Sequence, residues 1–435
     1  MAIASPNTTA STTSAPATGQ SYGVPLATVT TLFFMWGFLT CLNDILVPHL
    51  KAIFDLNYTQ VMLIQFAFFG AYFIFSIPSA RIIDAMGYQR SMVLGLLTMG
   101  VGAFLFVPAA SVPSYPLFLG ALIVLAAGIT CLQVAANPYV TVLGKPETAS
   151  SRLNLTQAFN SLGTFLAPFF GGLLILSSAP KTAADIRAMA PDAALAYRLH
   201  EAASVKMPYV GLGIALVLLA VAIGSFKLPK IEHAQHKVGE KVNDSIWRHP
   251  NLIFGAIAIF VYVGAEVSIG SFLVNYFAQP EIGGLTEKVA ASFVAFYWGG
   301  AMVGRFIGSA LLQKVKTGGL LGICAVCAAA LVAASMLTTG HFSMYSIILV
   351  GFFNSIMFPS IFTLGVAELG PLTGDGSGVM IMAIVGGAII PVAQGWIADH
   401  IGIHHAFFLP VICYLYILFF ALSGSKPNSE RYAKA

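Results

Sequence analysis

Long apolar stretches constrain this chain more than any other feature. Twelve of them, each close to the roughly 20 helical residues that cross a bilayer, are separated by charges, prolines and glycines. A backbone in lipid must satisfy its hydrogen bonds within a helix or a closed barrel, and stretches of this length favour helices. We therefore predict an all-α membrane protein with twelve transmembrane helices. They are expected at about 25–50, 57–80, 89–110, 115–142, 153–177, 207–226, 251–277, 287–313, 318–338, 343–367, 377–398 and 405–423.

Composition excludes a soluble protein. Hydrophobic residues make up 57% of the 435 residues and charged residues 9%, against about 25% charged in a soluble domain. The basic residues are scattered over short loops, so no nucleic-acid partner is expected. The five cysteines lie in apolar runs, and we interpret Cys324 and Cys327 as helix-packing residues rather than a metal or redox site. No cofactor and no metal are predicted.

Polar segments divide the chain. We predict a disordered tail, an amino-terminal six-helix bundle, a solvated linker, a carboxy-terminal six-helix bundle and a second tail, over 1–22, 23–226, 227–250, 251–424 and 425–435. The first 22 residues lack the features of a cleavable signal peptide. The stretch 178–206 is expected to be an external loop with short helical character. Few Lys and Arg residues fall in the predicted outer loops, which places both termini in the cytoplasm.

The two halves repeat each other. Pro138 and Leu143-Gly144 match Pro359 and Leu364-Gly365, and Pro359 follows Pro138 by 221 residues. Gly163 and Pro168 match Gly386 and Pro391, and Gly386 follows Gly163 by 223 residues. Parallel repeats of this kind place a substrate site between the halves, near the bilayer midplane.

Asp44 is a carboxylate inside the first predicted helix. An ionised carboxylate in hydrocarbon costs roughly 2.5–3.5 kcal/mol even on lenient scales, so it must face a polar cavity, have a partner or take up a proton. We predict that Asp44 carries a proton, with Asn43 beside it and Trp36 on the same face of the helix. The alternative is an interfacial residue that pairs with Lys51.

Glu266 is the other acidic residue deep in a predicted helix. It is expected to accept hydrogen bonds from a substrate or to be a second protonation site, and the alternative is a structural partner for a buried polar group. Several amides also lie in predicted helices and would suit a neutral polyhydroxyl ligand. For any single amide, hydrogen bonding between helices is the alternative. The amides are Gln133, Asn137, Gln157, Asn160, Asn275, Asn354 and Gln394.

Two further groups complete the predicted site. Trp36, Trp298 and Phe358 are candidates for aromatic contacts with the substrate, and lipid-facing positions are the alternative. Charged residues near the predicted inner ends would form a gating network, with ordinary positive-inside anchoring as the alternative. These residues are Arg81, Asp84, Arg90, Arg152 and Arg305.

The motifs resemble a known family. Residues 80–90 resemble the signature GxxxDxxGxxx of the major facilitator superfamily, with Ala80 in place of the first glycine. Further motifs resemble the fucose–galactose–glucose:proton symporter family over about residues 25–423. They are Leu42-Asn-Asp-Ile-Leu46, Ala135-Ala-Asn-Pro138, Arg152-Leu-Asn-Leu-x-Gln157, Gly304-Arg-Phe-x-Gly308 and Met357-Phe-Pro-Ser-Ile-Phe362.

The resemblance implies proton-coupled sugar uptake across a bacterial inner membrane by two pseudo-symmetric six-helix bundles of the major facilitator fold. It implies that Asp44 carries the proton and that Asn160 binds substrate. Fucose transporters of the family have a glutamate at Gln133 and a tyrosine at Phe358. The segment around Glu266 is more similar to the glucose/galactose branch, which favours a neutral hexose such as glucose, galactose or mannose.

Other functions remain open from the sequence. A uniporter or a sodium-coupled carrier of fucose, fructose or N-acetylglucosamine is the main alternative. A membrane-embedded enzyme or a sugar sensor is a weaker one, because no catalytic motif stands in a suitable context. The expected partners are a monosaccharide, a proton and the lipid bilayer, and the protein is expected to be a monomer.

Overall fold

The computed structural model describes residues 22–53, 58–112, 114–174, 181, 185, 186, 188–231, 244–427 and 429. For 42–53, 58–62, 170–174, 201–203, 205 and 287 it describes the backbone and not the side chain. The secondary-structure elements among these residues are all helices, with no strand. Residues 1–21 of the predicted first tail, 232–243 of the predicted linker, and 428 and 430–435 of the predicted second tail lie outside the described residues.

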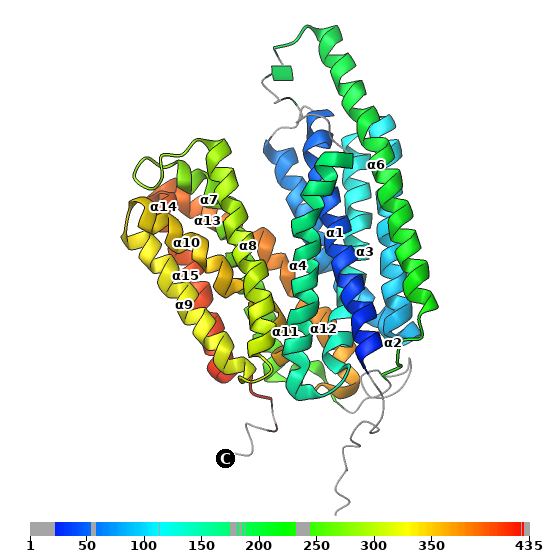
Figure 1. Ribbon diagram of the computed structural model, residues 1–435, viewed down its shortest axis with the longest axis vertical. Coiled ribbons are helices and arrows are strands. Elements are labelled where there is room, and N and C mark those ends of the chain that lie inside the picture. Colours follow the sequence, from blue (N-terminus) through cyan, green and yellow to red (C-terminus); the bar gives the residue numbers. More distant parts are fainter. Residues whose placement is uncertain are drawn as a thin grey trace, which may run out of the picture.

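Five long helices form the amino-terminal group in Figure 1. They are α1 (Gly23–Ile53), α2 (Tyr58–Ser111), α3 (Tyr115–Val142), α4 (Ala149–Leu174) and α6 (Pro191–Ser225). Two predicted spans are joined in α2, which changes direction at Gly87 with φ 82° and ψ 166°. A residue with a Cβ is strained at such a positive φ, so glycine is the residue that allows this sharp turn.

The carboxy-terminal group is made of shorter pieces. Its helices are α7 (Pro250–Ala278), α8 (Glu287–Leu311), α9 (Thr317–Leu337), α10 (Gly340–Asn354), α11 (Met357–Gly365), α12 (Thr373–Met382), α13 (Gly386–Ile401), α14 (Ile403–Ala406) and α15 (Phe408–Phe419). The two groups stand side by side and meet at the end of the molecule that carries α11 and α12 (Figure 1).

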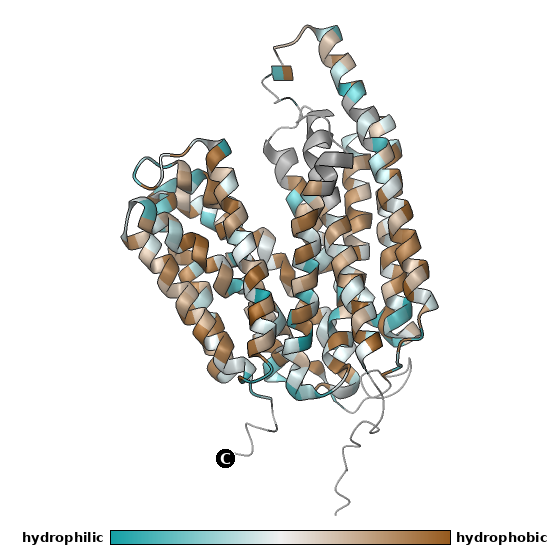
Figure 2. Ribbon diagram, viewed as in Figure 1, coloured by the Kyte–Doolittle hydropathy of each residue, from teal (hydrophilic) through white to brown (hydrophobic). Residues whose placement is uncertain are grey.

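The twelve predicted spans are confirmed. Ten described stretches are long and apolar enough to cross a membrane. One of these, Leu63–Ser111, contains two helices because of the turn at Gly87, and α4 adds the remaining span. Hydrophobic residues run along the helices, and hydrophilic residues gather toward their ends (Figure 2). The fold is therefore all-α, with two six-helix halves.

The stretch before the sixth span differs from the expectation. We expected an external loop over 178–206 with short helical character, whereas Pro191–Ser225 is one continuous helix that extends beyond the rest of its bundle (Figure 1). Pro191 stands in the first turn, where its missing N–H costs nothing. The alanine-rich segment that follows has a high helix propensity, so the helix starts early.

The tenth span is broken where the sequence predicts one helix over 343–367. Helix α10 ends at Asn354 and α11 begins at Met357. Pro359 lies just after the break, where it has no N–H for the carbonyl of Ser355 and its ring would clash with that carbonyl in a regular helix. The eleventh span is likewise divided, into α12, a 3-10 turn over Ala383–Val385, and α13.

The internal repeat is visible in the packing of two glycines. A Cβ added at Gly163 would lie 2.2 Å from the carbonyl oxygen of Phe34, and one at Gly386 would lie 2.0 Å from that of Phe260. The fifth span therefore touches the first, and the eleventh touches the seventh, at distances that only glycine permits. Small residues allow this close approach of helix backbones in membranes.

Candidate functional site

Polar side chains join the two halves where α4 begins and α8 ends. Ser150 Oγ lies 2.6 Å from Thr363 Oγ1. Ser151 Oγ donates to the carbonyl of Ser309 at 2.7 Å, and Asn154 Nδ2 donates to that of Arg305 at 2.8 Å. We call these residues, together with Ser161, the cross-half contact. It is polar, and apart from Arg305 its side chains are small and uncharged.

Arg305 is the charged member of the cross-half contact. Its Nη1 donates to Ser161 Oγ in the other half, and its Nε donates to the carbonyl of Ser355 at 3.3 Å. That carbonyl is the one that Pro359 cannot use, so Arg305 satisfies the acceptor that the helix break releases. Arg305 thus links the broken tenth span to α4.

The other predicted gating residues lie apart from this contact. Arg152 donates to the carbonyls of Val140 (3.3 Å), Thr141 (2.8 Å) and Lys145 (2.7 Å), and so closes the loop after α3 within its own half. Asp84 is half-buried, and a Cβ added at Gly374 of α12 would lie 3.5 Å from its Oδ1.

The two remaining basic residues of that group, Arg81 and Arg90, are exposed on α2. Two of the five predicted gating residues, Asp84 and Arg305, are therefore placed next to the other half.

In each of three amides of the amino-terminal half, the side-chain nitrogen donates a hydrogen bond to another residue of the protein. Gln133 Nε2 donates to Tyr72 OH at 2.7 Å, Gln157 Nε2 donates to Asn137 Oδ1 at 3.3 Å, and Asn160 Nδ2 donates to the carbonyl of Phe33 at 2.9 Å. The side-chain oxygens of Gln133, Gln157 and Asn160 have no hydrogen-bond partner among the described residues, and they keep some exposed surface although Gln133 and Gln157 are buried as whole residues. They remain available to a ligand.

Glu266 stands at the centre of a second cluster. The Tyr262 hydroxyl donates to Glu266 Oε1 at 2.8 Å and lies 3.1 Å from the carbonyl of Asn354. Asn354 Nδ2 donates to Tyr297 OH at 2.9 Å, and that hydroxyl lies 3.4 Å from the backbone oxygen of Glu266. The cluster unites α7, α8 and α10.

Some predicted substrate residues are enclosed in this conformation. Asn137, Asn354 and Gln394 are fully buried, and neither polar atom of the Gln394 side chain has a partner in the described part of the chain. Trp36 is buried against Phe33, with ring centroids 5.5 Å apart.

Others lie closer to the surface. Asn275 is exposed near the end of α7, and Phe358 is half-buried and stacked on Phe362. Asn43 and Asp44 lie in α1, and their side chains are outside the described residues.

Sequence reasoning missed several partners. Tyr72 and Ser161 gave no signal of their own. The pair Tyr262 and Glu266 could have been found from its spacing, because residues four apart share one face of a helix.

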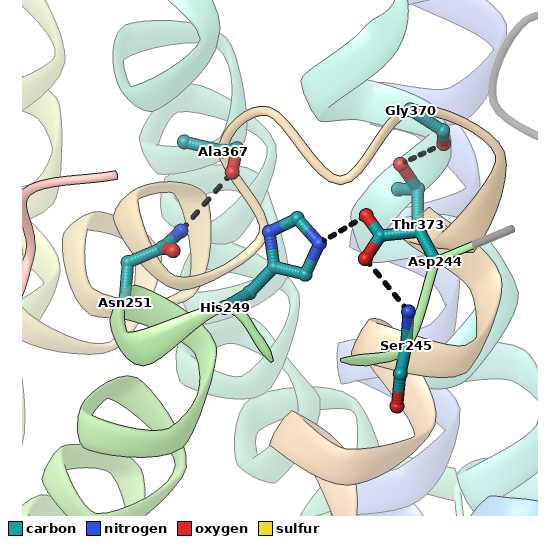
Figure 3. Close-up of polar contacts among 7 residues, drawn as sticks. All are labelled: Asp244, Ser245, His249, Asn251, Ala367, Gly370 and Thr373. Atoms are coloured by element: carbon teal, nitrogen blue, oxygen red, sulfur yellow. Dashed lines mark hydrogen bonds and ion pairs between the residues drawn. The ribbon is translucent and has the colours of Figure 1, made fainter. Parts of the chain in front are cut away.

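The junction between the linker and α7 was missed as well (Figure 3). His249 donates to Asp244 Oδ2 at 2.7 Å, and Asn251 Nδ2 donates to the carbonyls of Leu364 (3.2 Å), Gly365 (3.1 Å) and Ala367 (3.0 Å). The start of α7 is therefore fastened to the end of α11.

Known proteins share this sequence and architecture. A model of the Major Facilitator Superfamily matches residues 26–384. The glucose/galactose transporter of Brucella abortus is 54% identical over 407 residues, which cover 94% of this chain and 95% of that protein. The L-fucose-proton symporter of Escherichia coli is 37% identical over 409 residues, with 92% and 93% covered.

A solved relative has the same fold. The transporter FucP, in a structure described as the outward conformation, is 35% identical with a TM-score of 0.86, and the match covers 94% of this chain and 100% of that chain. The chain therefore belongs to the major facilitator superfamily, and the family predicted from its motifs is confirmed. It is a multi-span membrane transporter.

Proposed function

We propose that this protein is a sugar:proton symporter that imports a neutral hexose of the glucose, galactose or mannose type. The observation that carries the proposal is the set of half-used polar groups in both halves. Three amide oxygens of one half and a carboxylate oxygen of the other have no hydrogen-bond partner in the described part of the chain and keep some exposed surface. A polyhydroxyl ligand offers the donors and acceptors that such groups lack. The names of the relatives, glucose/galactose transporter and L-fucose-proton symporter, support the same class.

The proposed cycle is alternating access. The cross-half contact lies at the end that we assign to the cytoplasm, so the halves are closed on the inside. Sugar and a proton enter from the outside, the cross-half contact opens, and both leave inward. Asp44 is proposed as the proton carrier, because neutralising a carboxylate in α1 removes the cost of enclosing its charge. The proposed setting is a bacterial cytoplasmic membrane, with a monomeric protein and both termini inside.

Uptake into proteoliposomes tests this function. With an inward proton gradient and no sodium, radiolabelled D-glucose or D-galactose is expected to accumulate above the external concentration. Asp44→Asn is expected to abolish accumulation while sugar exchange across the membrane continues, since exchange requires no net proton movement. Accumulation that requires sodium, or uptake that only equilibrates, would favour the alternatives of a sodium-coupled carrier or a uniporter. Full accumulation by the variant would reject Asp44 as the carrier.

A further inference from the structure

One carboxylate oxygen of Glu266 accepts a hydrogen bond from the part of the protein that the structure describes, and the other does not. Its Oε1 accepts from Tyr262 at 2.8 Å. Its Oε2 has no partner within the described ranges, yet it is not among the buried polar atoms that lack one. The side chain is half-buried, whereas Tyr262 and Tyr297 are fully enclosed. The cluster therefore holds the carboxylate through Oε1 and leaves Oε2 without a partner among the described residues.

The hydrogen bonds around Glu266 are directed toward it. Tyr262 donates to its side chain, Tyr297 to its backbone, and Asn354 to Tyr297. The bond that Tyr262 donates to Oε1 favours a carboxylate oxygen at this position, because a donated hydrogen bond stabilises the charged form. This arrangement holds the carboxylate in one position and so suits an acceptor that must meet a ligand at a fixed place.

The indole ring of Trp298, in α8, lies against α7 one turn after Glu266. Gly270 follows Glu266 by four residues and shares its face of the helix. A Cβ added at Gly270 would lie 3.0 Å from Cζ2 of Trp298, so the ring rests on the bare backbone of the glycine. Trp298 is 45% exposed, and its edge meets Tyr297 with ring centroids 5.1 Å apart. The ring therefore contacts Gly270 and Tyr297 and keeps part of its surface exposed.

We propose that Glu266 and Trp298 form the sugar subsite of the carboxy-terminal half, in which Glu266 Oε2 accepts from one sugar hydroxyl and the indole covers the C–H face of the ring. The inference rests on the proposed sugar transport and assigns Glu266 to the substrate rather than to the proton. A fixed carboxylate oxygen gives a strong, directional bond to a hydroxyl. An apolar ring face beside it excludes water from that bond and makes it selective for a pyranose over a smaller polyol.

Binding of D-glucose, D-galactose and their single-deoxy analogues to the purified full-length protein tests the subsite. Glu266→Gln is expected to weaken binding of the parent sugar about 10- to 100-fold, the range for a hydrogen bond to a charged group. One deoxy analogue should lose affinity in the wild type and lose little more in the variant, because its missing hydroxyl is the partner of Glu266. Glu281→Gln, in an exposed loop residue, is the matched control and should leave affinity unchanged.

The ring is tested separately. Gly270→Ala pushes against Trp298 and should weaken binding several-fold, while Gly299→Ala, whose Cβ would meet nothing within 4 Å, should not. Trp298→Phe should also weaken binding, and Trp396→Phe, in a residue that is 64% exposed, should have no effect.

Unchanged affinity in Glu266→Gln, or an equal loss for every deoxy analogue, would overturn the assignment of a hydroxyl to Glu266. An altered ratio of protons to sugar in this variant would make Glu266 a proton site instead. If the wild type itself fails to accumulate hexose, the proposed function fails. If the wild type transports and only the variants disagree, the subsite alone fails.

Discussion

The bond between Arg305 and Ser161 gives a quantitative test of the cross-half contact. Arg305 Nε donates to the carbonyl of Ser355 within the carboxy-terminal half, whereas Nη1 donates to Ser161 Oγ in the other half. Only the second bond breaks when the halves separate at this end. Ser161→Ala therefore removes an interaction that exists in one state of the proposed cycle and not in the other.

The size of the effect follows from charge and burial. A hydrogen bond to a charged group contributes about 1.5–3 kcal/mol. Ser161 and Arg305 are both half-buried, and solvent screening reduces the contribution to about 1–1.5 kcal/mol. We expect Ser161→Ala to shift the equilibrium about five- to tenfold toward the state in which this end is open, since a state is favoured only by the contacts specific to it.

Pulsed electron paramagnetic resonance can measure this shift. Spin labels at Glu147 and Lys314, which are exposed and belong to different halves, would report the distance between the halves in a background without native cysteines. Ser225→Ala is the matched control. Ser225 and Ser161 both donate to the carbonyl four residues earlier, at 2.7 Å and 3.1 Å, but Ser225 lies at the exposed end of α6. Equal distance distributions for the wild type and Ser161→Ala would refute the reasoning, and a shift in Ser225→Ala would show that the assay reports helix stability.

Three further outcomes concern stability. Gly386→Ala should lower the melting temperature in detergent, because its Cβ would lie 2.0 Å from a carbonyl oxygen and overpacking costs about 1–3 kcal/mol, while Gly120→Ala, with nothing within 4 Å, should not lower it. Arg152→Lys should cost roughly 2–3 kcal/mol of stability through lost bonds to three carbonyls and leave sugar affinity unchanged; weaker sugar binding at equal stability would contradict this structural role. The pKa of Asp244 is lowered from 3.8, first by the hydrogen bond from the His249 ring and then by the Ser245 amide, so its contribution is present above pH 3.8 and is lost as the pH falls through the lowered value. Asp244→Asn should therefore lower stability slightly at pH 7, by less than about 1 kcal/mol because Asp244 is exposed, and by progressively less as the pH falls below 3.8; a pH-independent difference in melting temperature would contradict the linkage.

The sequence predicts the fold well because span length is a strong signal. About 20 apolar residues can do little except cross the bilayer, so the number of spans and the two halves follow directly. The direction that a side chain faces is a weaker signal, because lipid is as apolar as a packed interior and the two sides of a helix carry similar residues. Asn354 and Gln394 were thus predicted to bind substrate together with Glu266, yet both are fully enclosed and Glu266 is not.

The cross-half contact shows the same limit in another form. Arg305 stands out in the sequence because charge is rare in a membrane helix. Ser150, Ser151 and Ser161 do not, because serine commonly bonds to its own helix backbone and need not have any other partner. Their spacing along α4 becomes meaningful only when α8 is placed beside it.

The two repeat prolines show how similar halves acquire different tasks. Pro138 cannot donate to the carbonyl of Val134, and that carbonyl accepts from Ser377 Oγ of the other half at 2.8 Å. Pro359 releases the carbonyl of Ser355, the equivalent residue 221 positions later, and that carbonyl accepts from Arg305 at 3.3 Å. One free acceptor is used between the halves and the other within one half. In the proposed cycle a bond between the halves must break, while a bond within one half persists. The carbonyl released by Pro138 would then contribute to closure directly, and the one released by Pro359 would position Arg305, which contributes to closure through Ser161.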